Sequence, residues 1–155
     1  MSAPLAYLIT WTTYGTWLPG DRRGWVEAGK PGIQAADSAR ESVVLSELRF
    51  SPVQLDVSQR TVVSETNRKH CDIRDWTLHA LNVLTNHVHL VVTADDSPET
   101  VMSQLKAWCS RRLKEAEPCA RQVARGKWWT EHGSTKWIND ESYLQNAIHY
   151  VLEGQ

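Results

Sequence analysis

Several features that mark secreted, membrane-bound or strongly basic proteins are missing from this sequence. The three cysteines are widely spaced and form no CxxC pair, which excludes a disulfide framework and a zinc-finger pattern. There is no signal-peptide pattern and no apolar run of about 18 residues. We therefore expect a cytoplasmic protein without a membrane partner. The formal net charge is −1, so nucleic-acid binding would have to use a local basic surface.

What the sequence does contain is a series of strand and helix patterns over 155 residues, a length that suits one domain. β-branched and aromatic residues predict strands over 5–14, 76–84, 87–93 and 128–138, the last interrupted at residues 132–134. Helical apolar spacing and capping residues predict helices over 53–71, with a start near Ser51 and Pro52, over 95–117 and over 142–153. Glycine and proline in residues 15–50 predict a long loop, with room for a short hairpin near Trp17 and Trp25.

The order of these elements is strand, helix, strand, strand, helix, strand, followed by a terminal helix. This order predicts an α+β fold of the split βαββαβ (ferredoxin-like) type, an antiparallel sheet with helices on one face. The first and third strands would be central, and the second and last would be outer. The domain would span residues 1–155.

The third predicted strand begins with two histidines, His87 and His89, separated by one apolar residue. Alternating side chains share a face of a strand, so both imidazoles would lie about 6.6 Å apart on the face turned away from the helices. There they would be exposed and could share a cation. The alternative is a half-buried strand with two outward polar residues. Two histidines are also too few for most metal sites, so a third ligand is required.

The last predicted helix carries Tyr143 and Tyr150, seven residues apart and therefore roughly on one face. Packing of both rings on the edge of the sheet is the simpler interpretation. In the alternative, one phenol is a nucleophile that forms a phosphotyrosine with a phosphodiester. Such an attack requires a metal or a base to stabilise the developing charge.

Two groups of basic residues are interleaved with tryptophans. The first comprises Lys106, Trp108, Arg111 and Arg112, and the second places Arg22 and Arg23 near Trp17 and Trp25. A solvated helix face explains such charges in most proteins. Cations beside stacking aromatics also suit single-stranded nucleic acid. The residues alone leave both interpretations open.

Four local matches in the same order make the chain resemble the HUH single-tyrosine transposases of insertion sequences and their REP-associated relatives. Residues 86–90 (NHVHL) resemble the metal motif of this family, and residues 105–113 (LKAWCSRRL) resemble its LK…SRRL helix. Residues 128–129 with 137–141 (WINDE) are similar to the strand-and-cap segment, and residues 148–151 (IHYV) to the tyrosine helix. The opening strand also fits, so only residues 15–50 lie outside the resemblance.

The resemblance implies metal-dependent cleavage and joining of single-stranded DNA that carries a hairpin. His87 and His89 would hold Mg²⁺ or Mn²⁺, and Tyr150 would attack the phosphorus to give a 5′-phosphotyrosine and a free 3′-OH. Lys106 and Arg111 would lie near the DNA backbone.

The chain departs from the family pattern at the third ligand. The family commonly has Gln or Asn four residues after the tyrosine, where this chain has Gly154. Glu153 and Gln155 are the nearest substitutes, and a degenerate transposase would also explain the change.

Three other functions are compatible with the same residues. One is a non-catalytic, domesticated binder of structured single-stranded DNA. Another is a nickase like relaxases or replication initiators. The third is a zinc hydrolase that uses His87, His89 and His132. Both a monomer and a homodimer, with the tyrosine acting within or between subunits, agree with the resemblance.

Overall fold

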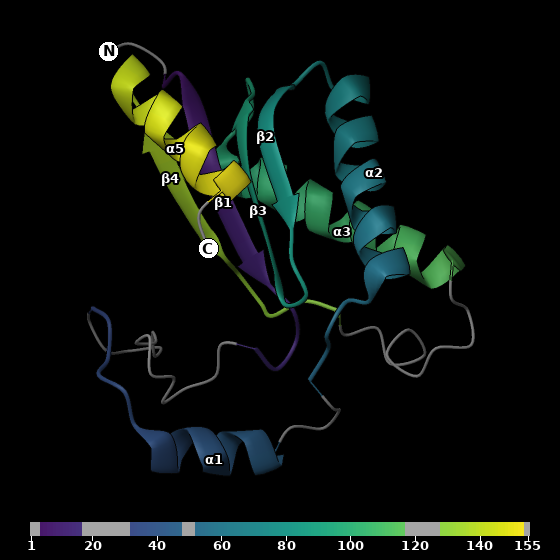
Figure 1. The fold of residues 1–155 in the computed structure, drawn as a ribbon, viewed down its shortest axis with the longest axis vertical. Helices are drawn as coiled ribbons and strands as arrows, with labels where there is room; N and C mark the ends of the chain where they lie inside the picture. Colours follow the sequence, from purple (N-terminus) through teal and green to yellow (C-terminus); the bar gives the residue numbers. More distant parts are fainter. Residues whose placement is uncertain (1–3, 17–31, 48–51, 117–127, 154–155) are drawn as a thin grey trace.

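The structure is a computed structural model that describes residues 4–16, 32–47, 52–116 and 128–153. The elements in these residues are, in order, β1 (Ala6–Thr12), α1 (Ser38–Glu47), α2 (Val57–Ile73), β2 (Thr77–Val83), β3 (His87–Thr93), α3 (Pro98–Ala116), β4 (Ser134–Ile138) and α5 (Glu141–Glu153) (Figure 1). The predicted α+β class and strand order are confirmed. Within the described residues, no helix is both long and apolar enough to cross a bilayer.

The four strands form one antiparallel sheet in the order β2-β3-β1-β4. The prediction that the first and third strands are central is therefore confirmed. The register pairs Thr10 of β1 with His89 of β3 and with Ser134 of β4. Asn82 of β2 lies opposite His89 on the other side. These pairings place residues from all four strands in one row across the sheet.

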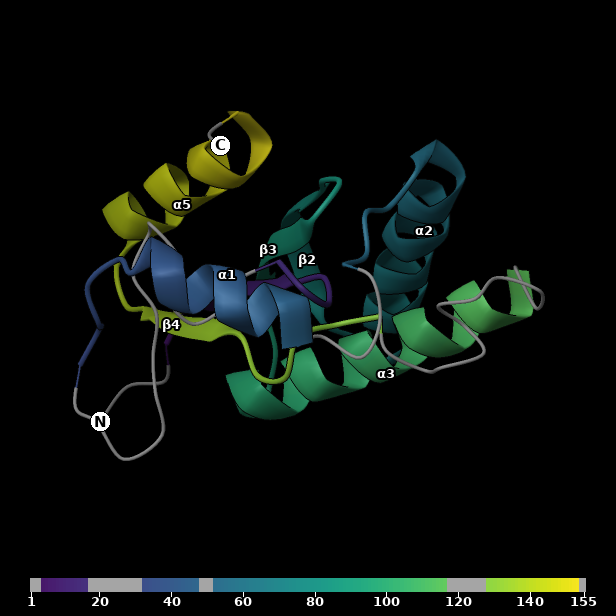
Figure 2. The same cartoon turned by 90° about the horizontal axis from the view of Figure 1, so that it is seen from below.

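Helices cover both faces of the sheet. The face that carries Val88, Leu90 and Val92 packs on apolar residues of α2 and α3. The other face packs on α5 through Leu144, Ala147, Val151 and their neighbours in the sheet. Figure 2 shows α5 and α3 on opposite sides of the strands.

The expectation that the histidine face is exposed is wrong, because α5 lies over it. The alternation in β3 sends Val88 and Leu90 to the α2–α3 side, so His89 points to the α5 side and is only 1% exposed. The apolar stripe of α5 requires a surface to cover, and this sheet face supplies it. The sequence shows that stripe but not the surface on which it packs.

Hydrogen bonds to side chains mark where the helices begin. Asp56 caps α2: its Oδ1 accepts from Gln59 N at 2.8 Å, and Gln59 Oε1 accepts from Asp56 N at 2.9 Å. The helix predicted to start near Ser51 and Pro52 therefore starts later. A capping box, D-x-x-Q, was the signal for the correct start. Asp140 caps α5 through a single bond, its Oδ1 accepting from Tyr143 N at 2.8 Å.

The segment predicted as a long loop contains helix α1. Asp37 Oδ1 accepts a hydrogen bond from Arg40 N at 3.1 Å at its start. Most described side chains of α1 are exposed. The helix therefore has no buried apolar stripe, which is the periodic pattern that predicts a helix from sequence. The hairpin expected near Trp17 and Trp25 lies outside the described residues, as do Arg22 and Arg23.

Candidate active site

The two predicted histidine ligands lie side by side on β3. The His87 and His89 rings are 5.2 Å apart between centroids and meet at 75°. Asn86 Oδ1 lies 2.8 Å from His87 Nδ1, so this amide oxygen accepts a hydrogen bond from the ring and holds its orientation. With Nδ1 protonated, Nε2 of His87 carries the lone pair that a metal ion would use.

His89 is the more deeply placed of the two. Its Nε2 is buried and has no hydrogen-bond partner among the described residues. Burial, together with the nearby His87, lowers the pKa of His89 from 6.5 to about 4. The imidazole is therefore neutral at physiological pH. A neutral, buried ring nitrogen without a partner costs folding free energy and is chemically suited to bind a cation.

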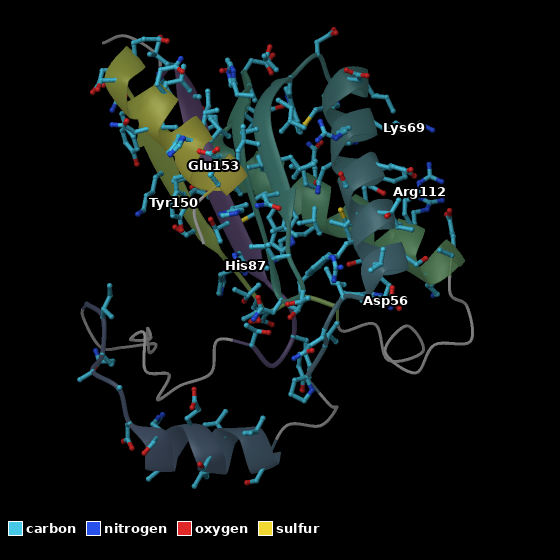
Figure 3. All side chains as sticks on the ribbon, viewed as in Figure 1. Asp56, Lys69, His87, Arg112, Tyr150 and Glu153 are labelled. Carbon is cyan, nitrogen blue, oxygen red and sulfur yellow. The ribbon has the colours of Figure 1, made fainter. Side chains whose placement is uncertain are left out.

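Tyr150 completes the group from the other side of the interface. Its ring centroid lies 5.4 Å from that of His89, in an edge-to-face contact of 78°. In α5, Ala147 and Val151 are buried, so Tyr150 sits at the margin of the stripe and remains 47% exposed. Figure 3 shows Tyr150 on α5 with His87 below it. The tyrosine is thus held against the histidines while remaining open to a large substrate.

Tyr143 behaves differently from Tyr150. It is partly buried and packs on the apolar cluster between α5 and the sheet. The packing interpretation therefore describes Tyr143, whereas Tyr150 contacts His89 of the histidine pair.

The third metal ligand is not found in the described part of the chain. Glu153 Oε2 lies 2.7 Å from His149 Nδ1, and both side chains are mostly exposed. No group of three or more His, Cys, Asp or Glu that could hold a metal occurs in the described residues. His87, His89 and His132 consequently do not form the zinc site of the hydrolase alternative. Gln155 lies outside the described residues.

Lys106, predicted to lie near the DNA backbone, makes two contacts within the protein. Its Nζ donates to Thr130 O at 2.9 Å and to His132 O at 2.7 Å, so it ties α3 to the segment before β4. Burial lowers the pKa of Lys106, and the charge of Glu131 opposes this effect. Two of its three N–H groups are engaged with backbone carbonyls.

The other predicted DNA-binding residues of α3 lie on the far side of the sheet from the histidines. The guanidinium groups of Arg111 and Arg112 lie 5.1 Å and 5.9 Å from the Trp108 ring centroid. Both arginines also pair with Glu115, at 3.5 Å and 3.1 Å. Trp108 and Arg112 line a groove of about 810 Å³ between α2 and α3. These residues and the histidine pair therefore cannot contact the same phosphate.

Two polar residues of β4 that no sequence pattern had singled out lie on the histidine face. Ile138 packs under α5, so Ser134 and Lys136 share its face by alternation. Ser134 pairs with Thr10, which pairs with His89. Lys136 is exposed at the outer strand. The spacing of two residues between Lys136 and the apolar Ile138 is the sequence pattern that could have predicted this placement.

The acid sensitivity of the apoprotein provides a first prediction. The unfolded chain protonates His89 near pH 6.5 and the folded chain only near pH 4. The unfolded state therefore binds more protons between these values, so stability is present above pH 6.5 and is lost as the pH falls toward 4. The slope reaches at most about 1.4 kcal/mol per pH unit. Denaturant unfolding in EDTA measures it, and His89→Leu should lack this contribution. An equal slope in the variant would contradict the assignment.

The fold and site define a class: an α+β protein with two histidines on a central strand and a tyrosine on a helix packed against them. Comparison with known proteins specifies it further. The family model described as "Transposase IS200 like" matches residues 42–153, and the chain belongs to this family of transposases.

Solved structures show the same fold at low sequence identity. One is the structure of the REP-associated tyrosine transposase bound to a REP hairpin, with a TM-score of 0.54 and 13% identity. The match covers 97% of this chain and 66% of that one, so this chain spans just under two thirds of that relative. Another is a candidate transposase from Deinococcus radiodurans R1, with a TM-score of 0.51, 16% identity and coverage of 100% and 94%. No curated protein sequence matches the chain.

Proposed function

We propose that this protein cleaves and rejoins single-stranded DNA, with Tyr150 as the nucleophile. The observation that carries the proposal is the contact of Tyr150 with His89 across the helix–sheet interface, in a member of the IS200-like transposase family. The packing of a buried core does not require a partly exposed phenol against an imidazole. A phosphodiester, in contrast, needs both a nucleophile and groups that manage charge around the phosphorus.

The covalent step transfers a phosphoryl group without a nucleotide cofactor. The phenol of Tyr150 loses its proton and its oxygen forms a bond to the phosphorus. The bond from phosphorus to the 3′ oxygen breaks, and this oxygen takes up a proton. The products are a 5′-phosphotyrosine and a free 3′-OH. Attack by another 3′-OH on the phosphotyrosine reverses the step and joins the strands.

The histidine pair is suited to a divalent metal ion. The unpartnered Nε2 of His89 and the orientation of His87 by Asn86 are the observations that support this. A bound Mg²⁺ or Mn²⁺ would supply Lewis-acid stabilisation of the phosphate oxygens. Glu153 could join these ligands only by leaving His149, and Gln155 remains a second candidate.

The row of polar side chains across the sheet suggests where the DNA backbone runs. Thr10 and Ser134 lie beside His89 on β1 and β4, and Lys136 lies two residues beyond Ser134 on the same face of the outer strand. Such hydroxyl and ammonium groups position a sugar–phosphate chain without reading its sequence. The solved relative bound to a REP hairpin supports a hairpin as the structured part of the substrate. Trp108, Arg111 and Arg112 are proposed to hold DNA distant from the cleaved phosphate.

Lys136 provides a second prediction. Lys136→Met should weaken binding of hairpin-bearing single strands uniformly across sequences and lower the slope of log K against log salt by about 1, because one phosphate contact is lost. Fluorescence anisotropy at several salt concentrations measures both. Lys114→Met, on α3, is the matched control and should keep the slope of the wild type. An unchanged slope in Lys136→Met would remove this residue from the DNA path.

The function itself is tested by covalent trapping. Single strands from the two ends of the gene's flanking sequence are incubated with protein and Mn²⁺ or EDTA, then separated under denaturing conditions. A protein–DNA adduct that depends on Mn²⁺ supports the proposal. Binding without an adduct under any divalent ion supports the non-catalytic binder instead. The missing third ligand in the described residues is the observation that favours this second candidate.

A further inference from the structure

One hydrogen bond links the sheet to the end of the tyrosine helix. Asn82 Nδ2, from β2, donates to the carbonyl oxygen of Val151 at 3.0 Å. Val151 directly follows Tyr150 in α5, and Asn82 lies opposite His89 in the register of β2 with β3. Asn82 therefore lies next to His89 in the sheet and also bonds to the helix backbone beside Tyr150.

This bond satisfies a carbonyl group at the end of the helix that has no partner within the helix. The last four carbonyl groups of an α-helix have no partner within the helix. Because α5 ends at Glu153, the carbonyl of Val151 is one of these four. Val151 is buried, so leaving its carbonyl without a partner would cost free energy. Asn82 supplies the missing donor from the sheet.

Apolar packing alone would not fix the helix with the same accuracy. Ala147 and Val151 rest on Ala80 and Val91, which are small or aliphatic side chains. Burial of such surfaces is favourable but has no preferred direction, so it tolerates small rotations and slides of the helix. The amide–carbonyl bond is directional, so it fixes both the rotation of the helix and its position along the sheet. A shift of the helix end moves the phenol of Tyr150 relative to His89.

We propose that Asn82 is a positioning residue that holds Tyr150 in line with the histidine pair. The proposal rests on the function proposed above, because the alignment matters only if Tyr150 attacks a phosphorus. Asn82 acts through the backbone of α5 and not on the DNA. Its loss should therefore reduce the rate of the covalent step and leave DNA affinity unchanged.

The test compares two substitutions at Asn82 with one on the same strand. Asn82→Leu keeps the approximate shape and removes the donor, whereas Asn82→Gln keeps an amide. The control, His79→Leu, removes a bond of 2.7 Å to Thr93 Oγ1, which does not involve α5. For each variant the single-turnover rate of adduct formation at saturating DNA, the DNA affinity, the melting temperature and the hydrogen–deuterium exchange of residues 141–153 are measured.

We expect Asn82→Leu to lower the adduct rate about 10²-fold, as a misplacement near 1 Å would. DNA affinity should stay within about threefold, since the bond contributes to alignment and not to DNA contact. Hydrogen–deuterium exchange of α5 should rise in Asn82→Leu. Asn82→Gln should recover part of the adduct rate. His79→Leu should leave the adduct rate and the exchange of α5 unchanged.

Other outcomes overturn the inference. A wild-type rate in Asn82→Leu would show that packing alone aligns the helix. A fall in rate that Asn82→Gln does not recover, with an equal loss of DNA affinity or melting temperature, would indicate a purely structural role. If the wild type forms no adduct, the proposed function fails. Separately, unchanged hydrogen–deuterium exchange of α5 in Asn82→Leu would show that Asn82 does not hold the helix end.

Discussion

Replacing Tyr150 by Phe should abolish the covalent adduct and leave hairpin DNA binding intact. The substitution removes one oxygen atom, and no other group of the ring can attack phosphorus. Packing should survive, because the ring, whose centroid lies 5.4 Å from that of His89, is retained and the side chain is 47% exposed. Denaturing gels with labelled single strands measure the adduct, and anisotropy measures the affinity.

Tyr143→Phe is the matched control for this experiment. Tyr143 lies on the same helix, one heptad earlier, and packs on the apolar cluster between α5 and the sheet. It should form the adduct at the rate of the wild type. An adduct that persists in Tyr150→Phe would place the nucleophile elsewhere and contradict the proposed mechanism. The same conclusion would follow if Tyr143→Phe alone removed the adduct.

Removing either histidine should produce the second large effect. His87→Ala and His89→Ala are each expected to weaken Mn²⁺ binding and to slow adduct formation by about 10²- to 10³-fold. A bound cation contributes several kcal/mol to the stabilisation of phosphoryl charge, and each 1.4 kcal/mol is about tenfold in rate. Titration calorimetry with Mn²⁺ and the trapping gel measure the two quantities.

Folding must be separated from metal binding in these variants. His89 is buried, so His89→Ala creates a cavity and should lower the melting temperature, whereas His87 is only partly buried. The metal effect should therefore appear in His87→Ala with little loss of stability. His132→Ala is the control, because His132 lies in the exposed segment before β4. An equal loss of Mn²⁺ affinity in His132→Ala would return the zinc hydrolase to consideration.

Much of the fold follows from local patterns in the sequence. The four strands and their antiparallel order are confirmed, because alternation of polar and apolar residues is fixed by burial on each face. The last strand is shorter than the predicted 128–138: it covers Ser134–Ile138, and Trp129 forms only an isolated bridge with Thr13. The start of α2 was misplaced, since a capping box at Asp56 outweighs a proline as a start signal. Helix α1 was missed because its described side chains bury little surface.

The site was predicted in its components but not in its setting. Two histidines two residues apart must share a face of β3, so their proximity needed no tertiary information. The burial of this face did require tertiary information. The apolar stripe of α5 does not indicate which face of the sheet the helix covers. The basic residues near Trp108 illustrate the same limit: a helix pattern shows that they cluster, not which side of the sheet they occupy.

The sequence by itself determined the strands, the paired histidines and the tyrosine on an amphipathic helix, because these depend on spacings of two and of three to four residues. Only the tertiary structure decided that Tyr150 meets His89, that Asn82 holds the end of α5 and that Lys136 joins the same face. These relations depend on which surfaces of distant elements are buried together, and one element's periodicity carries no information about its partner.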